Sequence, residues 1–156
     1  MNDFPAHQWL CENIVEQSSI AIIVGDREGI MRLWNAGAET IFGWSAEEAL
    51  SKSMDMIIPE KHRPRHWEGY DQVMKSGVTK YGSSVLAVPA LTKDGRRISV
   101  EFNVVLLKDA GGRVLGIAAS MQDVTARWER DKALRAHLAE AEAKLKQAGL
   151  SSENKS

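Results

Sequence analysis

The spacing of hydrophobic positions changes several times along the chain, and each spacing predicts a different element. Apolar residues recur at helical spacing over residues 5–18, which predicts a short amphipathic helix. The β-branched run Ile20–Val24 predicts a buried strand. A turn at Asp26–Gly29 leads into a second apolar run, Ile30–Trp34. The two runs and the turn between them predict a β-hairpin.

The segment after this hairpin carries start and stop signals for short helices. Residues Ala36–Phe42 have helical character, and Gly43 follows as a stop signal. Ser45 is followed three residues later by Glu48, which is the pattern of a capping box. We therefore expect a second short helix that begins after Ser45 and ends at Leu50.

A longer helix is predicted over Pro59–Gly77, because proline suits the first turn of a helix and glycine suits its C-terminal cap. On this helix Trp67 borders an apolar stripe. The stripe contains His66, Tyr70, Val73 and Met74. A histidine in such a stripe is either a packed core residue or a ligand to something that the stripe covers.

The next part of the chain predicts three strands separated by tight turns. Residues Thr79–Ala90 have strand character, and the turn sequence Lys93–Gly95 follows them. Residues Arg97–Leu107 alternate between apolar and polar, which is typical of a half-buried antiparallel strand. A turn at Asp109–Gly112 leads to the fifth strand, Val114–Met121.

From Ala126 the spacing becomes that of a heptad repeat. The repeat consists of Leu134, Leu138, Ala141, Leu145 and Ala148. Such a helix is either a solvated amphipathic tail or a coiled coil that dimerises and carries a signal. The predicted parts of the chain are an N-terminal helical cap (1–18), a central domain (19–125), a C-terminal helix (126–150) and a disordered tail (151–156).

This order of elements predicts an α+β fold, with five antiparallel strands and helices packed on one face of the sheet. The helical insert from Asn35 to Gly77 must cover that face, and it encloses a pocket unless side chains fill the space. The expected lining residues are Ile58, Tyr70, Val73, Val85, Leu86, Val88, Phe102, Val104 and Met121.

Composition narrows the classes of function. The 156 residues are 44% hydrophobic, which is enough for one domain with a core. The net charge of −1 favours neither nucleic acid nor an anionic membrane as a partner. A single cysteine, Cys11, and the absence of a secretory leader or a spanning apolar run favour the cytoplasm. No nucleophile motif or phosphate loop is present, so we expect no enzymatic activity.

Four sequence features resemble the PAS family of sensor domains. They are Trp34-Asn35, Phe42–Ser45, Lys93–Gly95 and Asp123-Val124-Thr125. The resemblance covers about residues 10–125 and implies a PAS fold followed by a signalling helix. It leaves the ligand open, because PAS domains bind haem, flavin, small acids or nothing.

The stretch from Pro59 to His66 also resembles the helix of haem-binding PAS domains of the FixL and Dos oxygen-sensor type. By this resemblance His66 is the proximal ligand of a b-type haem, and Phe102 and Val104 lie on the distal side. The sixth position of the iron would bind O2, CO or NO. His62 is a second candidate ligand that we expect to be more exposed.

Three positions depart from the haem-binding pattern. The strand after the helix carries apolar Val85 and Leu86 where the pattern has an arginine that bonds to O2. Ser83 or Ser84 stands where Dos-type proteins supply a methionine ligand, and Tyr70 falls one residue late. Without a hydrogen-bond donor, O2 would be held less well than CO or NO.

Two alternatives to haem remain. A non-covalent flavin, FAD or FMN, would be lined by Trp34, Trp44, Trp67 and Asn103. The other alternative is a ligand-free interaction module whose pocket is filled by side chains. Under each hypothesis the helices at both ends are expected to form a homodimer, and the output passes to an unknown partner.

Overall fold

A computed structural model describes residues 5–80 and 86–153 of the chain. The chain divides into two compact units, Met1–Asp123 and Val124–Ser156, which are described separately. Within the described residues, no helix combines the length and the apolar character that a membrane-spanning segment needs.

The first unit is built on an antiparallel sheet of five strands in the order β2-β1-β5-β4-β3. The strands are β1 (Ala21–Asp26), β2 (Met31–Trp34), β3 (Leu86–Leu91), β4 (Arg97–Lys108) and β5 (Val114–Asp123). The predicted five-stranded α+β fold is therefore confirmed. The last strand lies between β1 and β4 at the centre of the sheet, so it contacts elements from both halves of the unit.

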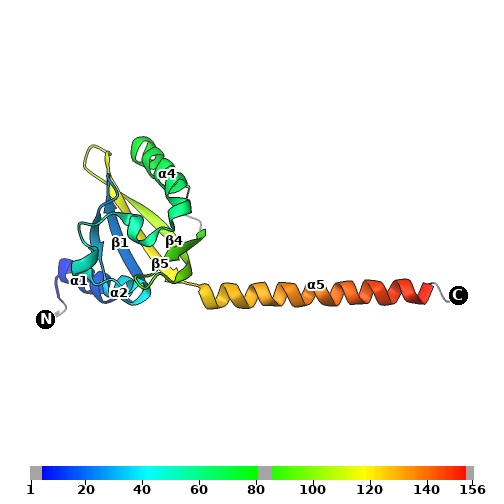
Figure 1. The fold of residues 1–156 in the computed structure, drawn as a ribbon. Helices are drawn as coiled ribbons and strands as arrows, with labels where there is room; N and C mark the ends of the chain where they lie inside the picture. The colour runs from blue at the N-terminus through cyan, green and yellow to red at the C-terminus, as the bar shows by residue number, and fades with distance from the viewer. Residues whose placement is uncertain (1–4, 81–85, 154–156) are drawn as a thin grey trace. The chain divides into compact units, whose positions relative to one another are not determined.

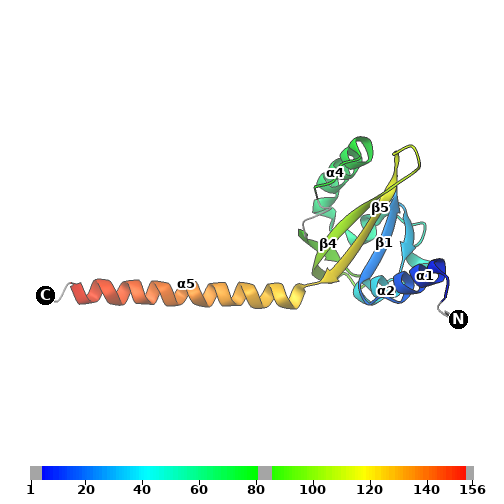
Figure 2. The same cartoon turned by 180° about the vertical axis from the view of Figure 1, so that it is seen from behind.

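Helices precede the sheet and connect its two halves. They are α1 (His7–Gln17), α2 (Ala36–Phe42), α3 (Ala46–Ala49), the 3-10 turns η1 (Met54–Ile57) and η2 (Glu60–His62), and α4 (Arg63–Ser76). Figure 1 shows the sheet from the side that carries the segment between β2 and β3, and Figure 2 shows β1, β4 and β5 from the other side. The insert thus covers one face, as the sequence predicts.

The local signals read from the sequence mark the ends of these helices. Gly43 and Gly77 have φ of 78° and 67° and end α2 and α4 in the left-handed conformation, which glycine adopts without a steric penalty. Ser45 and Glu48 form the complete capping box of α3. Asn35 caps α2 by accepting from the backbone N–H of Ala38.

Three predicted boundaries are wrong. The 3-10 turn η2 (Glu60–His62) precedes α4, which begins at Arg63, because Pro64 lacks an N–H and suits only the first turn of an α-helix. The strand predicted from Thr79 does not include residues 79–80, whereas 81–85 lie outside the described residues. The C-terminal helix, predicted to end at residue 150, continues through Gly149 to Glu153, since an exposed glycine costs a helix only about 1 kcal/mol.

The core lies between the covered face of the sheet and the insert. Along β4 the buried side chains alternate with more exposed ones: Ile98, Val100 and Val104 are 1%, 2% and 8% exposed, whereas Val105 is 61% exposed. This confirms the predicted alternation. The largest fully buried side chains are Phe42, Ile23, Met31, Ile98, Val100 and Asn35. One of these six is polar.

The second unit consists mainly of one helix, α5 (Thr125–Glu153), and it continues directly from β5. Three leucines of the predicted heptad repeat, Leu134, Leu138 and Leu145, are 69%, 59% and 74% exposed. Residues 151–153, which were expected in a disordered tail, belong to the helix, and 154–156 lie outside the described part.

Candidate functional site

Helix α4 lies against the turn between β1 and β2. The indole N–H of Trp67 donates to the carboxylate of Asp55 at 2.8 Å, and its ring lies directly over Gly29, where a Cβ would collide with it. One turn further along, the hydroxyl of Tyr70 donates to the backbone oxygen of Asp26. The side of α4 that carries the predicted site therefore has defined partners in η1, at the end of β1 and on the turn.

His66 is half-buried on this side of α4. Its ring centroid lies 4.9 Å from that of Trp67 in an edge-on arrangement and 5.8 Å from that of Tyr70. Its Nδ1 is buried and has no hydrogen-bond partner among the described residues. Burial lowers the pKa of His66, and the nearby charge of Asp55 opposes this effect only in part. The imidazole is therefore held neutral, which is the form that binds a metal ion.

His62 is less exposed than the sequence predicts. It is half-buried, and its Nε2 is also a buried ring nitrogen without a partner in the described part of the chain. His62 closes the 3-10 turn, because its backbone N–H donates to the carbonyl of Pro59 at 2.8 Å. This tight turn places the histidine one turn before His66, so both remain candidate ligands.

The predicted wall on the sheet is a row of cross-strand neighbours. Phe102 pairs with Leu86 on one side and with Met121 on the other, and opposite residues in a sheet point to the same face. Val104 pairs with Ala119 in the next such row. Phe102 and Met121 are partly buried against the core. The register thus brings these predicted residues together.

Other members of the predicted site stand apart from this row. Tyr70 is 7% exposed and Val73 packs on the core from α4, so both share a helix with His66. Val85 lies outside the described residues, and so does the side chain of Leu86.

A haem beside His66 would find a suitable nitrogen ligand, but Met54 occupies part of the neighbouring space. The neutral His66 and the apolar row on the sheet fit the chemistry of a haem ligand and its surroundings. However, the end of Met54 occupies the space above Gly25 beside the Tyr70 hydroxyl. Met54 would have to move for a haem to extend into this space, and a methionine side chain can do so because it adapts its shape readily. With that movement, the residues fit a haem.

The four residues considered for a flavin do not line one space. Asn103 is exposed and bonds to Ser120, so it lies on the sheet face opposite Val104. Trp34 is 3% exposed and donates to the carbonyl of Trp44 at 2.9 Å. Asn103 was therefore wrongly predicted to line a flavin pocket together with the three tryptophans.

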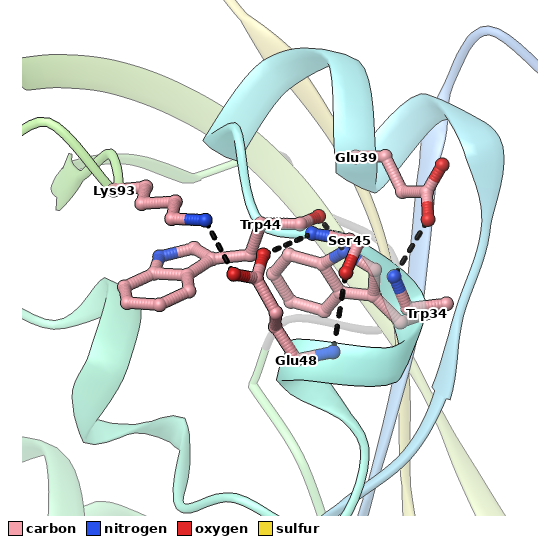
Figure 3. Close-up of polar contacts among 7 residues, drawn as sticks. Trp34, Glu39, Trp44, Ser45, Glu48 and Lys93 are labelled. Carbon is pink, nitrogen blue, oxygen red and sulfur yellow. Dashed lines mark hydrogen bonds and ion pairs between the residues drawn. The ribbon is translucent and has the colours of Figure 1, made fainter.

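A surface hollow of about 440 Å³ lies elsewhere, between the end of α2 and the turn that follows β3. Figure 3 shows the adjoining corner, in which Lys93 forms an ion pair with Glu48 and lies 5.3 Å from the centre of the Trp44 ring. The N–H of Lys93 also donates to the carbonyl of Phe42 at 2.8 Å. These contacts join the predicted Lys93–Gly95 turn to the helical insert.

The structure also identifies two residues whose roles the sequence does not reveal. Asn35 is fully buried, and its side chain bonds to several separate backbone groups. Arg27, in the turn between β1 and β2, donates to backbone carbonyls of both β5 and α4. Neither role has a local sequence signal beyond the cap that Asn35 provides, because the partners are distant along the chain.

We expect His66 to make the folded state less stable in acid. The unfolded chain binds the proton of this histidine at about pH 6.5, whereas the folded chain binds it only at a lower pH. Stability should therefore fall as the pH drops below about 6.5. Urea unfolding at about pH 7.5 and about pH 5.5 should show a smaller loss of stability for His66→Gln than for the wild type. His137→Gln, in α5, is the control and should retain the full loss.

A family model described as the PAS fold matches residues 15–129. The sensor protein FixL of Bradyrhizobium diazoefficiens is 44% identical over 46 residues, which are 30% of this chain and 9% of FixL. The oxygen sensor protein DosP of Escherichia coli is 27% identical over 82 residues, which are 53% of this chain and 10% of DosP. The matches span between 9% and 16% of the lengths of the curated relatives.

Among solved structures, an RNA-binding light-oxygen-voltage receptor superposes with a TM-score of 0.71. It is 20% identical, and the match covers 89% of this chain and 41% of the receptor. At this identity the likeness shows the fold alone.

Proposed function

Because this chain belongs to the PAS family, a family of sensor and interaction domains, we propose that it binds a b-type haem through His66 and senses a diatomic gas. The observation that carries the proposal is the buried Nδ1 of His66, which has no partner among the described residues. Leaving a polar atom buried without a partner costs free energy, so a partner from outside the described residues, such as water or a ligand, is expected here. The likeness to FixL and DosP supports the same assignment.

The residues around His66 would prepare it as a ligand. The rings of Trp67 and Tyr70 hold the imidazole in place, and Asp55 orients Trp67 in turn. Burial keeps the imidazole neutral, so no proton has to leave before it binds a metal. When bound, the haem iron supplies the position at which O2, CO or NO coordinates.

The sheet side of the proposed pocket is apolar. Phe102 and Met121 pair across β4 and β5, and Val85 and Leu86 are apolar where FixL-type and Dos-type sensors carry a donor for O2. An apolar cover excludes water but offers no hydrogen bond to a bound gas. We therefore propose that the site holds CO and NO in preference to O2.

The signal would leave the first unit through β5, because the chain continues from this strand directly into α5. A gas that binds two arrangements of the sheet with different affinities shifts the population between them. The exposed leucines of α5 and the exposed Trp9 of α1 are the surfaces on which we propose that a homodimer forms.

The test is an absorption spectrum of purified protein with added hemin, recorded for the wild type, His66→Ala, His62→Ala and His137→Ala. We expect the intense Soret band of coordinated haem in the wild type and the His137→Ala control, and its loss in His66→Ala. Loss only in His62→Ala would move the ligand to His62. No band in the folded wild type would refute the haem proposal.

A second candidate function is a ligand-free interaction module. The close packing of Met54 and Tyr70 over Gly25 favours it, since a filled interior needs no cofactor. Under this hypothesis the protein is colourless with or without hemin, and light scattering shows a dimer. A yellow protein would instead indicate bound FAD or FMN.

A further inference from the structure

Two cations contact the C-terminal end of α4. The guanidinium Nη2 of Arg27 donates to the backbone oxygen of Met74 at 3.5 Å, and Nζ of Lys108 donates to the backbone oxygen of Gly77 at 3.1 Å. The last carbonyls of a helix have no partner within the helix and carry its partial negative charge. Positive side chains at this end therefore stabilise the position of the helix as well as its last turn.

The same guanidinium also contacts the central strand. Nη1 of Arg27 donates to the backbone oxygen of Val114, the first residue of β5. Both bonds are partly buried, so water competes with them less than it would at an exposed site. The planar fork of arginine serves two acceptors at once, which the single ammonium of lysine cannot reproduce in the same geometry.

Both contacts converge on one rung of the sheet. Lys108 and Val114 are paired neighbours at the end of the β4–β5 ladder, where the register shifts. A Cβ placed on Gly77 would lie 3.6 Å from Nζ of Lys108 and 3.7 Å from Cγ2 of Val114. The end of α4 therefore lies beside the first rung of β5.

We propose that Arg27 couples the position of α4 to the start of β5. The proposal deepens the proposed function, because α4 carries His66. An α-helix rises 1.5 Å per residue, so Met74 lies about 12 Å from His66 along the axis of the same helix. When the helix shifts at His66, its last turn shifts too. Either Val114 follows that shift, or a bond of Arg27 breaks.

Coupling can be measured without any ligand by moving α4 from its other end. Trp67→Leu removes the indole ring that packs on Gly29 and bonds to Asp55. Hydrogen exchange of the backbone amides is then followed at the start of β5, over residues 112–116. With Arg27 present, we expect Trp67→Leu to increase exchange there about tenfold, as expected when charge-assisted bonds are weakened.

The decisive comparison is the same substitution in the Arg27→Met background. We expect exchange at the start of β5 to be faster already, and Trp67→Leu to increase it less than about twofold further. Arg32→Met is the matched control, because the ion pair of Arg32 is with Asp26 and not with a residue of α4. In that background the tenfold effect should remain. An equal effect of Trp67→Leu in all three backgrounds would overturn the proposal.

Two additions keep this test separate from the haem proposal. If Arg27→Met fails to fold, Arg27→Lys takes its place, because it keeps the charge and should still lose the coupling. Hemin is then added to the wild type and to the Arg27 variant. If hemin changes the hydrogen exchange of residues 112–116 in the wild type but not in the Arg27 variant, the result supports both haem binding and the coupling role of Arg27. If hemin does not bind, the haem proposal fails, and the Trp67→Leu comparison still decides the role of Arg27.

Discussion

Replacing Asn35 with alanine is expected to lower the free energy of unfolding by about 3–5 kcal/mol. The side chain is fully buried, and both the oxygen and the nitrogen of its amide group form hydrogen bonds with the backbone. Its Nδ2 donates to the carbonyls of Val15, Ser18 and Ile20, and its Oδ1 accepts from the N–H groups of Ile22 and Ala38. Alanine would leave these groups without the partner that they have in the buried site.

The size of this effect follows from what Asn35 joins. It connects the end of α1, the start of β1 and the first turn of α2, so its loss weakens three elements together. A domain is typically stable by only about 5–15 kcal/mol, so the variant should unfold at a much lower urea concentration. The control is Asn13→Ala, since Asn13 bonds only within α1 in the contacts described, and a change below about 0.5 kcal/mol is expected. A loss below about 1 kcal/mol for Asn35→Ala would contradict the role assigned to it.

Two glycine-to-alanine substitutions are expected to change stability in opposite directions. A Cβ on Gly37 would lie 2.7 Å from the carbonyl oxygen of Ser18 and closer still to the carbonyl group of Ile20. These are backbone atoms, so α2 would have to move away, and we expect a loss of about 2–3 kcal/mol. Gly69 lies on the exposed side of α4 with nothing within 4 Å of its Cβ position, so alanine should stabilise the fold by about 0.5–1 kcal/mol.

Thermal and urea unfolding of Gly37→Ala and Gly69→Ala measure both effects in one series. The substitutions are chemically identical, so helix propensity alone predicts that both stabilise. Opposite signs would show that the close approach of α2 to the chain before β1 determines the result at Gly37. Stabilisation by Gly37→Ala would mean that this approach is looser than the structure describes.

The parts of the fold that were predicted correctly depend on local signals. Gly43 and Gly77 end their helices because glycine adopts the left-handed conformation without a steric penalty. The alternation along β4 reflects the two faces of a strand, which any window of that sequence displays. The start of α4 was misplaced because Pro59 and Pro64 both suit a first turn, and the sequence does not choose between them.

The parts that could not be predicted depend on residues far apart in the chain. Asn35 bonds to the carbonyl of Val15, twenty positions away, and Arg27 bonds to that of Val114, eighty-seven positions away. No spacing rule joins such pairs. For the candidate site, helical periodicity placed His66 and Tyr70 on one side of α4, but it gave no indication that Met54 occupies the space beside them.

Helix α5 has 29 residues, so it extends about 43 Å at 1.5 Å per residue. Each residue also turns the helix by about 100° about its axis. The number of residues before a side chain therefore determines its direction around the axis as well as its distance along it. Removing seven residues ahead of the exposed leucines of α5 leaves them within about 20° of their former direction around the helix axis. Removing two residues rotates them to nearly the opposite side of the axis. The number of residues between Thr125 and Leu134 therefore determines the direction around the helix axis in which the exposed leucines of α5 face.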